Sequence, residues 1–287
     1  MNVSMSIEGE KVGLTTHPFK LLKNIDFSGL SASLNIVGTG ADGGLFLNSR
    51  YNTRDIEMEG MIDVTGKDEG WLKRQKEILY RICNPKEQVT LEIEENGETY
   101  YINAHPVSFP IFLNNKANKN KSFQTFMIQM VASDPYLYTD KRVVTFSSVT
   151  PTFSFPLEMN EIVMGEKKTT LIESIWNDGM MDCPIEIVMR ALQSVTNPYL
   201  VEVYTQKKIQ LNTTLDEGDI VVINTGRKKE ISRYRDGVKE NFFWSLDLEN
   251  SAFISLRRGD NVFRFGADFN QDFLEIEIRY QQRMGGI

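Results

Sequence analysis

The stretch QVTLEIEENGETYYINA, residues 88–104, decides the fold class of this chain. Apolar and polar residues alternate on both sides of Asn96-Gly97, which is the pattern of strands with one buried face. The dipeptide supplies the positive backbone angles of a two-residue turn, so the stretch predicts a β-hairpin. The apolar side chains of the hairpin are Val89, Leu91, Ile93, Tyr100 and Ile102.

The alternation continues outside the hairpin. From Asp55 to Val64, apolar residues face one side and acidic residues the other, which predicts a strand with an exposed acidic face. One helix interrupts the strands, with Asp68 and Glu69 in its first turn and Asn84-Pro85 at its end. Its apolar stripe consists of Trp71, Leu72, Ile78, Leu79 and Ile82.

The second half of the chain shows strand patterns only. Short apolar stretches are separated by turns that contain glycine, such as Gly218-Asp219 and Gly259-Asp260. About eight or nine short strands with regular turns predict an antiparallel β-sandwich. The Ser-, Thr- and Pro-rich stretch from Ser147 to Pro156 is interpreted as a boundary, so we expect two mainly β domains, residues 1–146 with one helix and residues 147–287.

Composition limits the functions that are open to the chain. Its 287 residues carry a net charge of −7, which argues against a general nucleic-acid binder or a basic membrane-surface protein. No apolar run approaches the roughly 20 residues of a membrane helix, and the N-terminus lacks the pattern of a signal peptide. We therefore expect a protein that is made in the cytoplasm and does not insert into a membrane.

Residues suited to catalysis are scarce. The chain has two histidines, and His17 and His105 have no partner at metal-ligand spacing, so both are interpreted as neutral structural residues. Cys83 and Cys183 are interpreted as reduced, partly buried thiols, with a long-range disulfide as the alternative. Gly38-Thr39-Gly40 is interpreted as a flexible loop, because no helix start follows it. We expect no catalytic residue, no cofactor and no metal site.

The order of these elements resembles the distal tail protein family of long-tailed phages of Gram-positive hosts. The matching segments run along nearly the whole chain and are residues 22–29, 54–60, 134–138, 177–179, 184–187, 215–223 and 251–261, together with the single helix. The strand after Pro184 departs from the family pattern, because it runs into Met189-Arg190-Ala191 where the family usually has a glycine.

The resemblance implies a structural protein of the virion tail tip without enzymatic activity. Six copies of the first domain would form a ring that joins the major tail tube protein to the tail tip and its tail-associated lysin. DNA would pass through the central channel without specific binding. The second domain, a galectin-like sandwich, would project outward and carry receptor-binding or adhesion proteins.

Two physical features fit such a ring. The hairpin is expected to protrude and add to a neighbour's sheet, with an ordinary internal hairpin as the alternative. Its candidate contact residues are Val89, Leu91, Ile93, Asn96, Gly97, Tyr100 and Ile102. Acidic strand faces are expected to line the channel, because negative walls do not hold passing DNA.

Two other classes of function remain open. The first is a carbohydrate-binding module that holds host wall saccharide through exposed aromatic side chains of the second domain. The candidate aromatic residues are Tyr199, Tyr204, Tyr234, Phe242, Phe243 and Trp244. The second is a cell-wall hydrolase, which would need a pair of carboxylates across a cleft.

Overall fold

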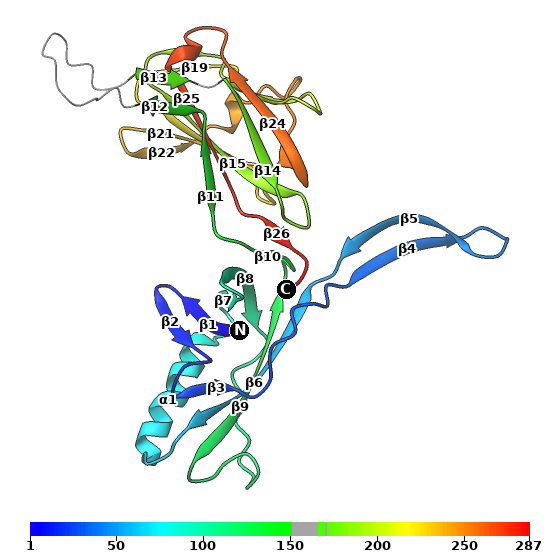
Figure 1. Ribbon diagram of the computed structural model, residues 1–287, viewed down its shortest axis with the longest axis vertical. Helices are drawn as coiled ribbons and strands as arrows, with labels where there is room; N and C mark the ends of the chain where they lie inside the picture. Colours follow the sequence, from blue (N-terminus) through cyan, green and yellow to red (C-terminus); the bar gives the residue numbers. More distant parts are fainter. Residues whose placement is uncertain (151–165, 170) are drawn as a thin grey trace, which may run out of the picture. The chain divides into compact units, whose positions relative to one another are not determined.

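The computed structural model describes residues 1–150, 166–169 and 171–287 (Figure 1). The chain divides into two compact units, Met1–Asp140 together with Arg283–Ile287, and Lys141–Gln282. The chain therefore crosses between the units twice, whereas the sequence predicts one boundary, between residues 146 and 147. Of the stretch Ser147 to Pro156, residues 151–156 lie outside the described part of the chain.

The first unit is an antiparallel sheet with one helix and a separate pair of strands. The sheet contains β1 (Asn2–Ile7), β2 (Glu10–Gly13), β3 (Phe19–Leu21), β6 (Arg54–Asp63), β7 (Val89–Glu95), β8 (Glu98–Pro106), β9 (Phe123–Ala132), β10 (Leu137–Tyr138) and β26 (Arg283–Met284). Its main order is β2-β1-β7-β8-β9-β6-β3, and β10 joins β8 to β26. The separate pair is β4 (Ala32–Gly38) with β5 (Gly44–Tyr51).

The helix forms where the sequence predicts it. Helix α1 spans Glu69–Ile82, and the Asp68 carboxylate caps it by accepting a 2.7 Å hydrogen bond from the Trp71 backbone N–H. Its buried residues are Leu72, Leu79 and Ile82, which belong to the same core as the apolar face of the sheet. The helix therefore covers one face of the sheet and leaves the opposite face in solvent.

The hairpin of residues 88–104 forms, but it does not protrude. Strands β7 and β8 pair along their length, and the last pair before the turn is Glu95 with Glu98. Asn96 and Gly97 make the turn, with φ values of 52° and 85°. Strand β1 pairs with the other edge of β7, so this edge is already occupied within the chain. The apolar candidates Val89, Leu91, Ile93, Tyr100 and Ile102 are all buried in the core. The expectation of a protruding hairpin is corrected, because the core of its own unit takes up its apolar face.

The second unit contains two main antiparallel sheets and two short strand pairs. The larger sheet runs β11 (Arg142–Thr145), β25 (Leu274–Tyr280), β15 (Cys183–Ala191), β20 (Ile220–Asn224), β21 (Glu230–Arg235) and β22 (Val238–Asn241), with β23 (Ser255–Leu256) on β15. The smaller sheet runs β14 (Ile172–Asn177), β24 (Gly259–Gly266), β17 (Tyr199–Glu202) and β18 (Lys207–Gln210). The remaining elements are β12 (Ser147–Thr150), β13 (Glu166–Thr169), β16 (Val195–Thr196), β19 (Thr214–Leu215) and the short 3₁₀ helices η1 (Phe243–Ser245) and η2 (Gln271–Phe273).

One apolar core lies between these two sheets. It joins side chains of the larger sheet, such as Ile187 and Ile276, to side chains of the smaller sheet, such as Leu200 and Phe263. Two sheets that share a core form a sandwich, so the predicted mainly β fold class is confirmed.

A buried ion cluster fixes the Gly218-Asp219 turn of the second unit. The fully buried Asp219 carboxylate accepts two hydrogen bonds from Arg235, of 2.7 and 2.6 Å, and one of 3.0 Å from the Asp216 backbone N–H. Arg233 lies 3.7 Å from the same carboxylate. Burial alone would raise the pKa of Asp219, but the bonds from Arg235 and Asp216 outweigh it and lower that pKa.

Arg54 holds the C-terminal segment to the first unit. Its buried guanidinium donates hydrogen bonds to the backbone carbonyls of Pro135 (2.9 Å), Phe27 (2.5 Å) and Gly285 (2.6 Å). Just before Gly285, strand β26 pairs with β10, with Leu137 opposite Met284. The chain therefore ends within the unit in which it begins.

Candidate functional site

Side chains suited to catalysis do not gather at one place. Within the described residues, no three His, Cys, Asp or Glu side chains come together as a metal ion would need. His17 Nδ1 lies 3.9 Å from Asp63 at the surface, and His105 is on the exposed face of β8. Cys83 and Cys183 are buried and are not joined by a disulfide, and burial raises the pKa of Cys83 to about 12. No helix of this described part is long and apolar enough to cross a membrane.

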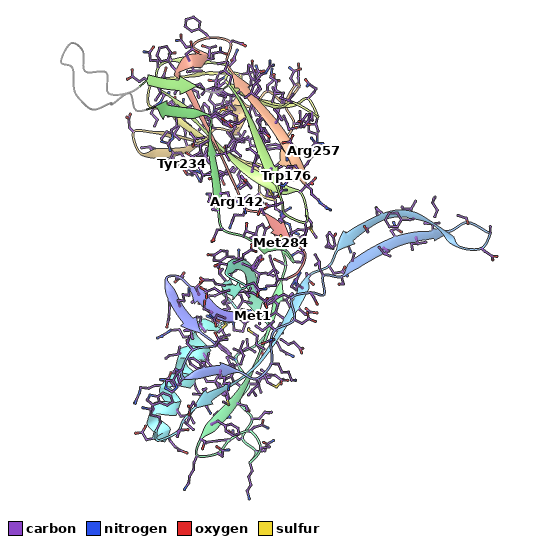
Figure 2. All side chains as sticks on the ribbon, in the orientation of Figure 1. Met1, Arg142, Trp176, Tyr234, Arg257 and Met284 are labelled. Atoms are coloured by element: carbon purple, nitrogen blue, oxygen red, sulfur yellow. The ribbon has the colours of Figure 1, made fainter. Side chains whose placement is uncertain are left out.

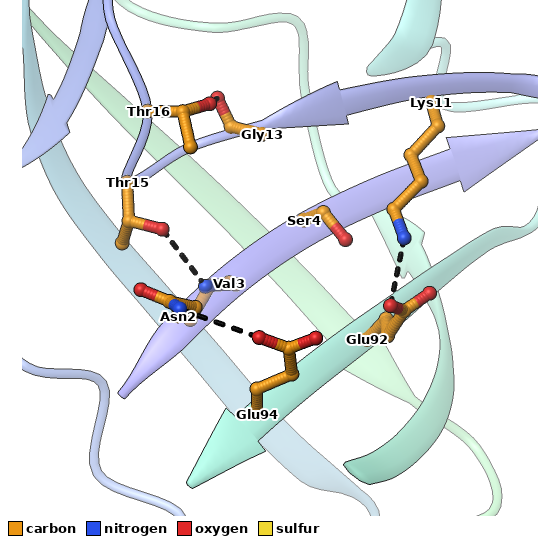
Figure 3. Close-up of a pocket in the computed structure, with 9 residues that line it drawn as sticks. All are labelled: Asn2, Val3, Ser4, Lys11, Gly13, Thr15, Thr16, Glu92 and Glu94. Atoms are coloured by element: carbon orange, nitrogen blue, oxygen red, sulfur yellow. Dashed lines mark hydrogen bonds and ion pairs between the residues drawn. The ribbon is translucent and has the colours of Figure 1, made fainter. Parts of the chain in front are cut away.

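A shallow cleft of about 300 Å³ lies over strands β1, β2 and β7 (Figure 3). Two carboxylates line it, but each is already engaged. Lys11 lies 2.7 Å from Glu92, and the Asn2 side-chain amide donates a 3.3 Å hydrogen bond to Glu94. Carboxylates engaged in this way fit a solvated sheet face better than an acid pair across a cleft.

The cleft belongs to a larger acidic face. Glu92 on β7 pairs with Tyr101 on β8. Further along β8, His105 pairs with Val131 on β9, and Val131 in turn pairs with Asp55 on β6. Because alternate residues share a face of a sheet, this register places six carboxylates on the solvent side of β6 and β7. These residues are Asp55, Glu57, Glu59, Asp63, Glu92 and Glu94.

The β4–β5 pair forms an exposed arm, which we define as residues 32–51. Every residue of both strands is exposed, and the two strands pair only with each other among the strands that the structure describes. Figure 1 shows the arm leaving the main sheet of its unit. Its large exposed apolar side chains are Leu34, Ile36, Val37, Leu45, Phe46, Leu47 and Tyr51.

A second apolar surface of the first unit lies between β8 and β9. The segment 107–113 is tied to β9 by hydrogen bonds of 2.8 Å from Val107 N–H to the Gln129 carbonyl and 2.9 Å from Ile111 N–H to the Met127 carbonyl. Alternate residues of this segment point to solvent, and Tyr80 of α1 adds a ring 6.0 Å from that of Phe109. Its exposed side chains are Val107, Phe109, Ile111 and Leu113.

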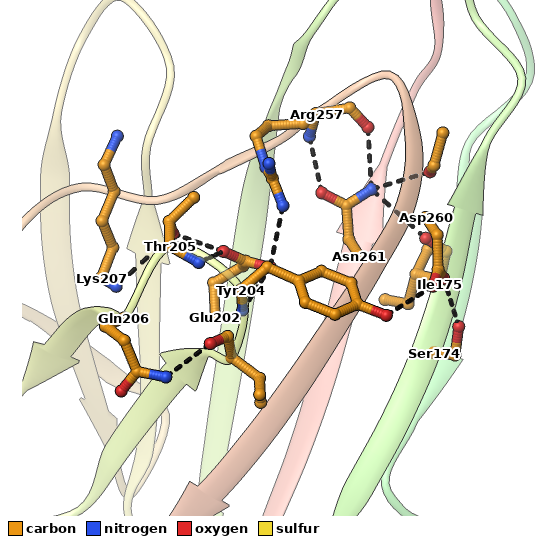
Figure 4. A network of polar contacts seen from close by, with 12 residues as sticks. Ser174, Ile175, Glu202, Tyr204, Thr205, Gln206, Lys207, Arg257, Asp260 and Asn261 are labelled. Carbon is orange, nitrogen blue, oxygen red and sulfur yellow. Dashed lines mark hydrogen bonds and ion pairs between the residues drawn. The ribbon is translucent and has the colours of Figure 1, made fainter.

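A polar network organises one end of the smaller sheet of the second unit (Figure 4). The buried Glu202 carboxylate accepts hydrogen bonds from the backbone N–H groups of Tyr204 (3.2 Å) and Thr205 (2.6 Å) and from the Thr205 hydroxyl. Arg257 lies 3.3 Å from the same carboxylate. Burial by itself raises the pKa of Glu202, but these bonds outweigh it and lower that pKa, so the carboxylate is ionised.

The same network reaches the neighbouring strands. Asp260 accepts hydrogen bonds from the Ser174 hydroxyl (2.6 Å) and the Tyr204 hydroxyl (2.8 Å), and these two bonds lower its pKa. Asn261 is fully buried, and its amide nitrogen donates to the carbonyls of Arg257 (2.8 Å) and Gly259 (2.9 Å). The turn between β23 and β24 is therefore rigid.

The candidate aromatic residues of the second unit differ in their exposure to solvent. Phe242 is fully buried, while Tyr204 and Trp244 are well exposed. Tyr199, Tyr234 and Phe243 are partly buried. Trp176, which is exposed on β14, was not predicted from the sequence, because its position between the apolar Ile175 and the polar Asn177 indicates no outward direction.

Comparisons with known proteins agree along the chain. Residues 178–284 match the family described as siphovirus-type tail component, C-terminal domain, and residues 7–132 match the phage tail protein RIFT-related domain. A comparison with curated proteins gave no match.

Two solved structures share the fold over almost their whole length. The crystal structure of SPP1 Dit (gp 19.1), described as a paradigm of the hub adsorption apparatus in phages that infect Gram-positive bacteria, is 14% identical with a TM-score of 0.67, covering 98% of each chain. A chain of the phage P2 baseplate in its activated conformation with Ca is 11% identical with a TM-score of 0.60, covering 100% of this chain and 99% of that chain. With the two family matches, this agreement shows that the chain belongs to the siphophage distal tail protein family.

Proposed function

We propose that six copies of this chain close into a ring that forms the hub at the distal end of a phage tail. The observation that carries the proposal is the exposed arm. An isolated two-stranded hairpin is marginally stable in water, and a contiguous apolar surface on a protein marks a contact site. The apolar side chains of the arm therefore call for a cover from another molecule.

A second copy of the chain supplies such a cover. The arm of one copy and the segment 107–113 of the next are different surfaces, so their contact is heterologous. Repeated heterologous contacts close into a ring when the rotation between copies allows it. Six is the number of copies that the resemblance to distal tail proteins implies.

The acidic sheet face supports a DNA channel through this ring. Lys11 and Lys23 offset only part of its charge, through ion pairs of 2.7 Å with Glu92 and 2.9 Å with Glu59. A wall of net negative charge repels phosphates, so DNA would pass without being held.

The hub would link the tail tube protein on one side to the tail-tip protein with its lysin on the other. The second unit would carry the receptor-binding or adhesion proteins. The protein would be located at the tail tip of the virion and would have no enzymatic activity of its own.

Mass photometry of the purified chain tests the ring. The expected species has about six times the 32.9 kDa mass of one chain. Phe46→Asp in the arm places a charge on the contact and should dissociate the ring, while Leu248→Asp, at an exposed apolar residue of the second unit, should leave it intact. A chain that stays monomeric at high concentration, or a ring that survives Phe46→Asp, would contradict the proposal.

Disulfide trapping tests the partner of the arm. A mixture of Phe46→Cys and Phe109→Cys chains should form a covalent dimer under mild oxidation, because the native Cys83 and Cys183 are buried and do not compete. The control pairs Phe46→Cys with Leu248→Cys. Equal yields of covalent dimer in both mixtures would show that segment 107–113 is not the specific contact of the arm.

A further inference from the structure

An exposed tryptophan marks the outer face of the smaller sheet. Trp176 is 64% exposed although its strand neighbours Ile175 and Asn177 are buried, so its exposure does not come from a loose loop. Strand β14 pairs with β24 over its full length, which places Asp260 directly opposite Trp176. Paired residues share a face of the sheet, so the indole and the carboxylate lie side by side on the solvent side.

A second aromatic ring borders the same carboxylate. Tyr204 is 57% exposed, and its hydroxyl bonds to Asp260. The Arg257 guanidinium lies 5.9 Å from the centre of the Tyr204 ring, and Figure 2 labels Arg257 and Trp176 at the same end of the unit. We name this surface the Trp176 platform, consisting of Trp176, Tyr204, Arg257 and Asp260.

The platform is held rigid from below. Glu202, beneath Tyr204 in the network, fixes the backbone of Tyr204 and contacts Arg257. Burying a carboxylate costs free energy unless hydrogen bonds and a cation compensate it, and here both are present. The network thus holds the Tyr204 ring, the Arg257 guanidinium and the Asp260 carboxylate in fixed positions, which lowers the entropy cost of binding a ligand.

The chemistry of the platform fits a neutral saccharide. A pyranose ring has apolar C–H faces that stack on an aromatic ring, and its hydroxyl groups both donate and accept hydrogen bonds. The Asp260 carboxylate accepts from a hydroxyl, and the Arg257 guanidinium, with five N–H donors, donates to one. An apolar peptide would leave both charged groups desolvated, and an anionic polymer would meet the Asp260 carboxylate between the two rings.

We propose that the Trp176 platform is a binding site for a neutral hexose-based saccharide. The site lies within one chain, so it does not depend on the ring proposed above.

Calorimetry on the full chain tests the site, with chitotriose, cellotriose and maltotriose as probes and poly(glycerol phosphate) as the anionic comparison. At least one neutral trisaccharide should bind. Trp176→Ala should weaken that binding about tenfold to a hundredfold, the range for loss of one stacking ring. Phe269→Ala, which removes an aromatic ring that is 65% exposed elsewhere in the same unit, should leave the affinity unchanged.

Thermal unfolding of each variant shows whether it is folded, and Trp176→Tyr, which keeps an aromatic face, should retain most of the affinity. The proposal is overturned if no neutral trisaccharide binds at millimolar concentration, or if Trp176→Ala and Phe269→Ala weaken binding equally. The proposal is also overturned if poly(glycerol phosphate) binds and no neutral trisaccharide does. The same holds if a baseplate protein docks through Trp176 while no sugar binds.

Discussion

Replacing Asp219 by asparagine should destabilise the second unit through its buried ion cluster. The variant keeps the shape of the side chain but removes the charge that neutralises Arg235 and Arg233. Removing one partner of a fully buried pair typically costs about 3–5 kcal/mol. Because the Arg235 side chain is 41% exposed and regains water in the variant, we expect a smaller loss, about 2–3 kcal/mol at pH 7.

Asp216→Asn provides a matched control. Asp216 contacts the same guanidinium at 2.7 Å, but its side chain is 64% exposed, so its loss should cost about 0–1 kcal/mol. Scanning calorimetry of both variants measures the difference as a shift of the midpoint, roughly 5–10 °C for Asp219→Asn. A loss below about 1 kcal/mol, or equal losses for the two variants, would refute the reasoning.

The pH dependence of stability tests whether the charge of Asp219 is the source of this stabilisation. The pKa of Asp219 is lower in the folded chain than in the unfolded one, so its stabilisation is complete above the unfolded value of about 4. It is lost as the pH falls through the folded pKa. The difference in stability between the native chain and Asp219→Asn should therefore shrink below about pH 4, and a difference that stays constant would mean that the charge is not its source.

Three further predictions concern the first unit. Gly97→Val should lower its stability by about 1–2 kcal/mol in urea unfolding, because φ at Gly97 is 85° and a β-branched residue is strained there. Arg54→Met should leave the carbonyl of Gly285 without its guanidinium donor and speed amide hydrogen exchange in residues 283–287, whereas unchanged exchange would show that β26 pairing alone holds the segment. Cys83, with its pKa raised to about 12, should resist iodoacetamide at pH 8 in the folded chain and react in urea, as measured by mass spectrometry.

Local patterns were sufficient to predict the strands and the helix. Alternation around Asn96-Gly97 predicted the β7–β8 hairpin, and the acidic pair Asp68-Glu69 and the breaker Pro85 predicted where α1 begins and ends. The place of the hairpin in the sheet was not predictable in this way. It depends on β1 pairing with β7, a contact between residues more than 80 positions apart, and strand partners at such distances leave no local pattern.

The arm and the Trp176 platform were missed for related reasons. Leu34, Ile36, Leu45 and Leu47 have the composition of a buried strand, so the sequence does not show that they are exposed. Only the loop at the tip, with positive φ at Gly40 and Gly43, agrees with the flexible segment that we predicted. In the platform, Asp260 was interpreted as a turn residue, but it lies in strand β24. Its bonds to Ser174 and Tyr204 come from residues that are distant in sequence.

The double crossing between the units has a mechanical consequence. In the role proposed above, a phage that is attached to its host and pulled by flow would place tension on the second unit. Two peptide segments, at residues 140–141 and 282–283, share that load, so each carries only part of it. A protease that cuts the first segment still leaves the second unit covalently joined to residues 283–287, which β10 and Arg54 hold in the first unit. A single break therefore does not release the second unit.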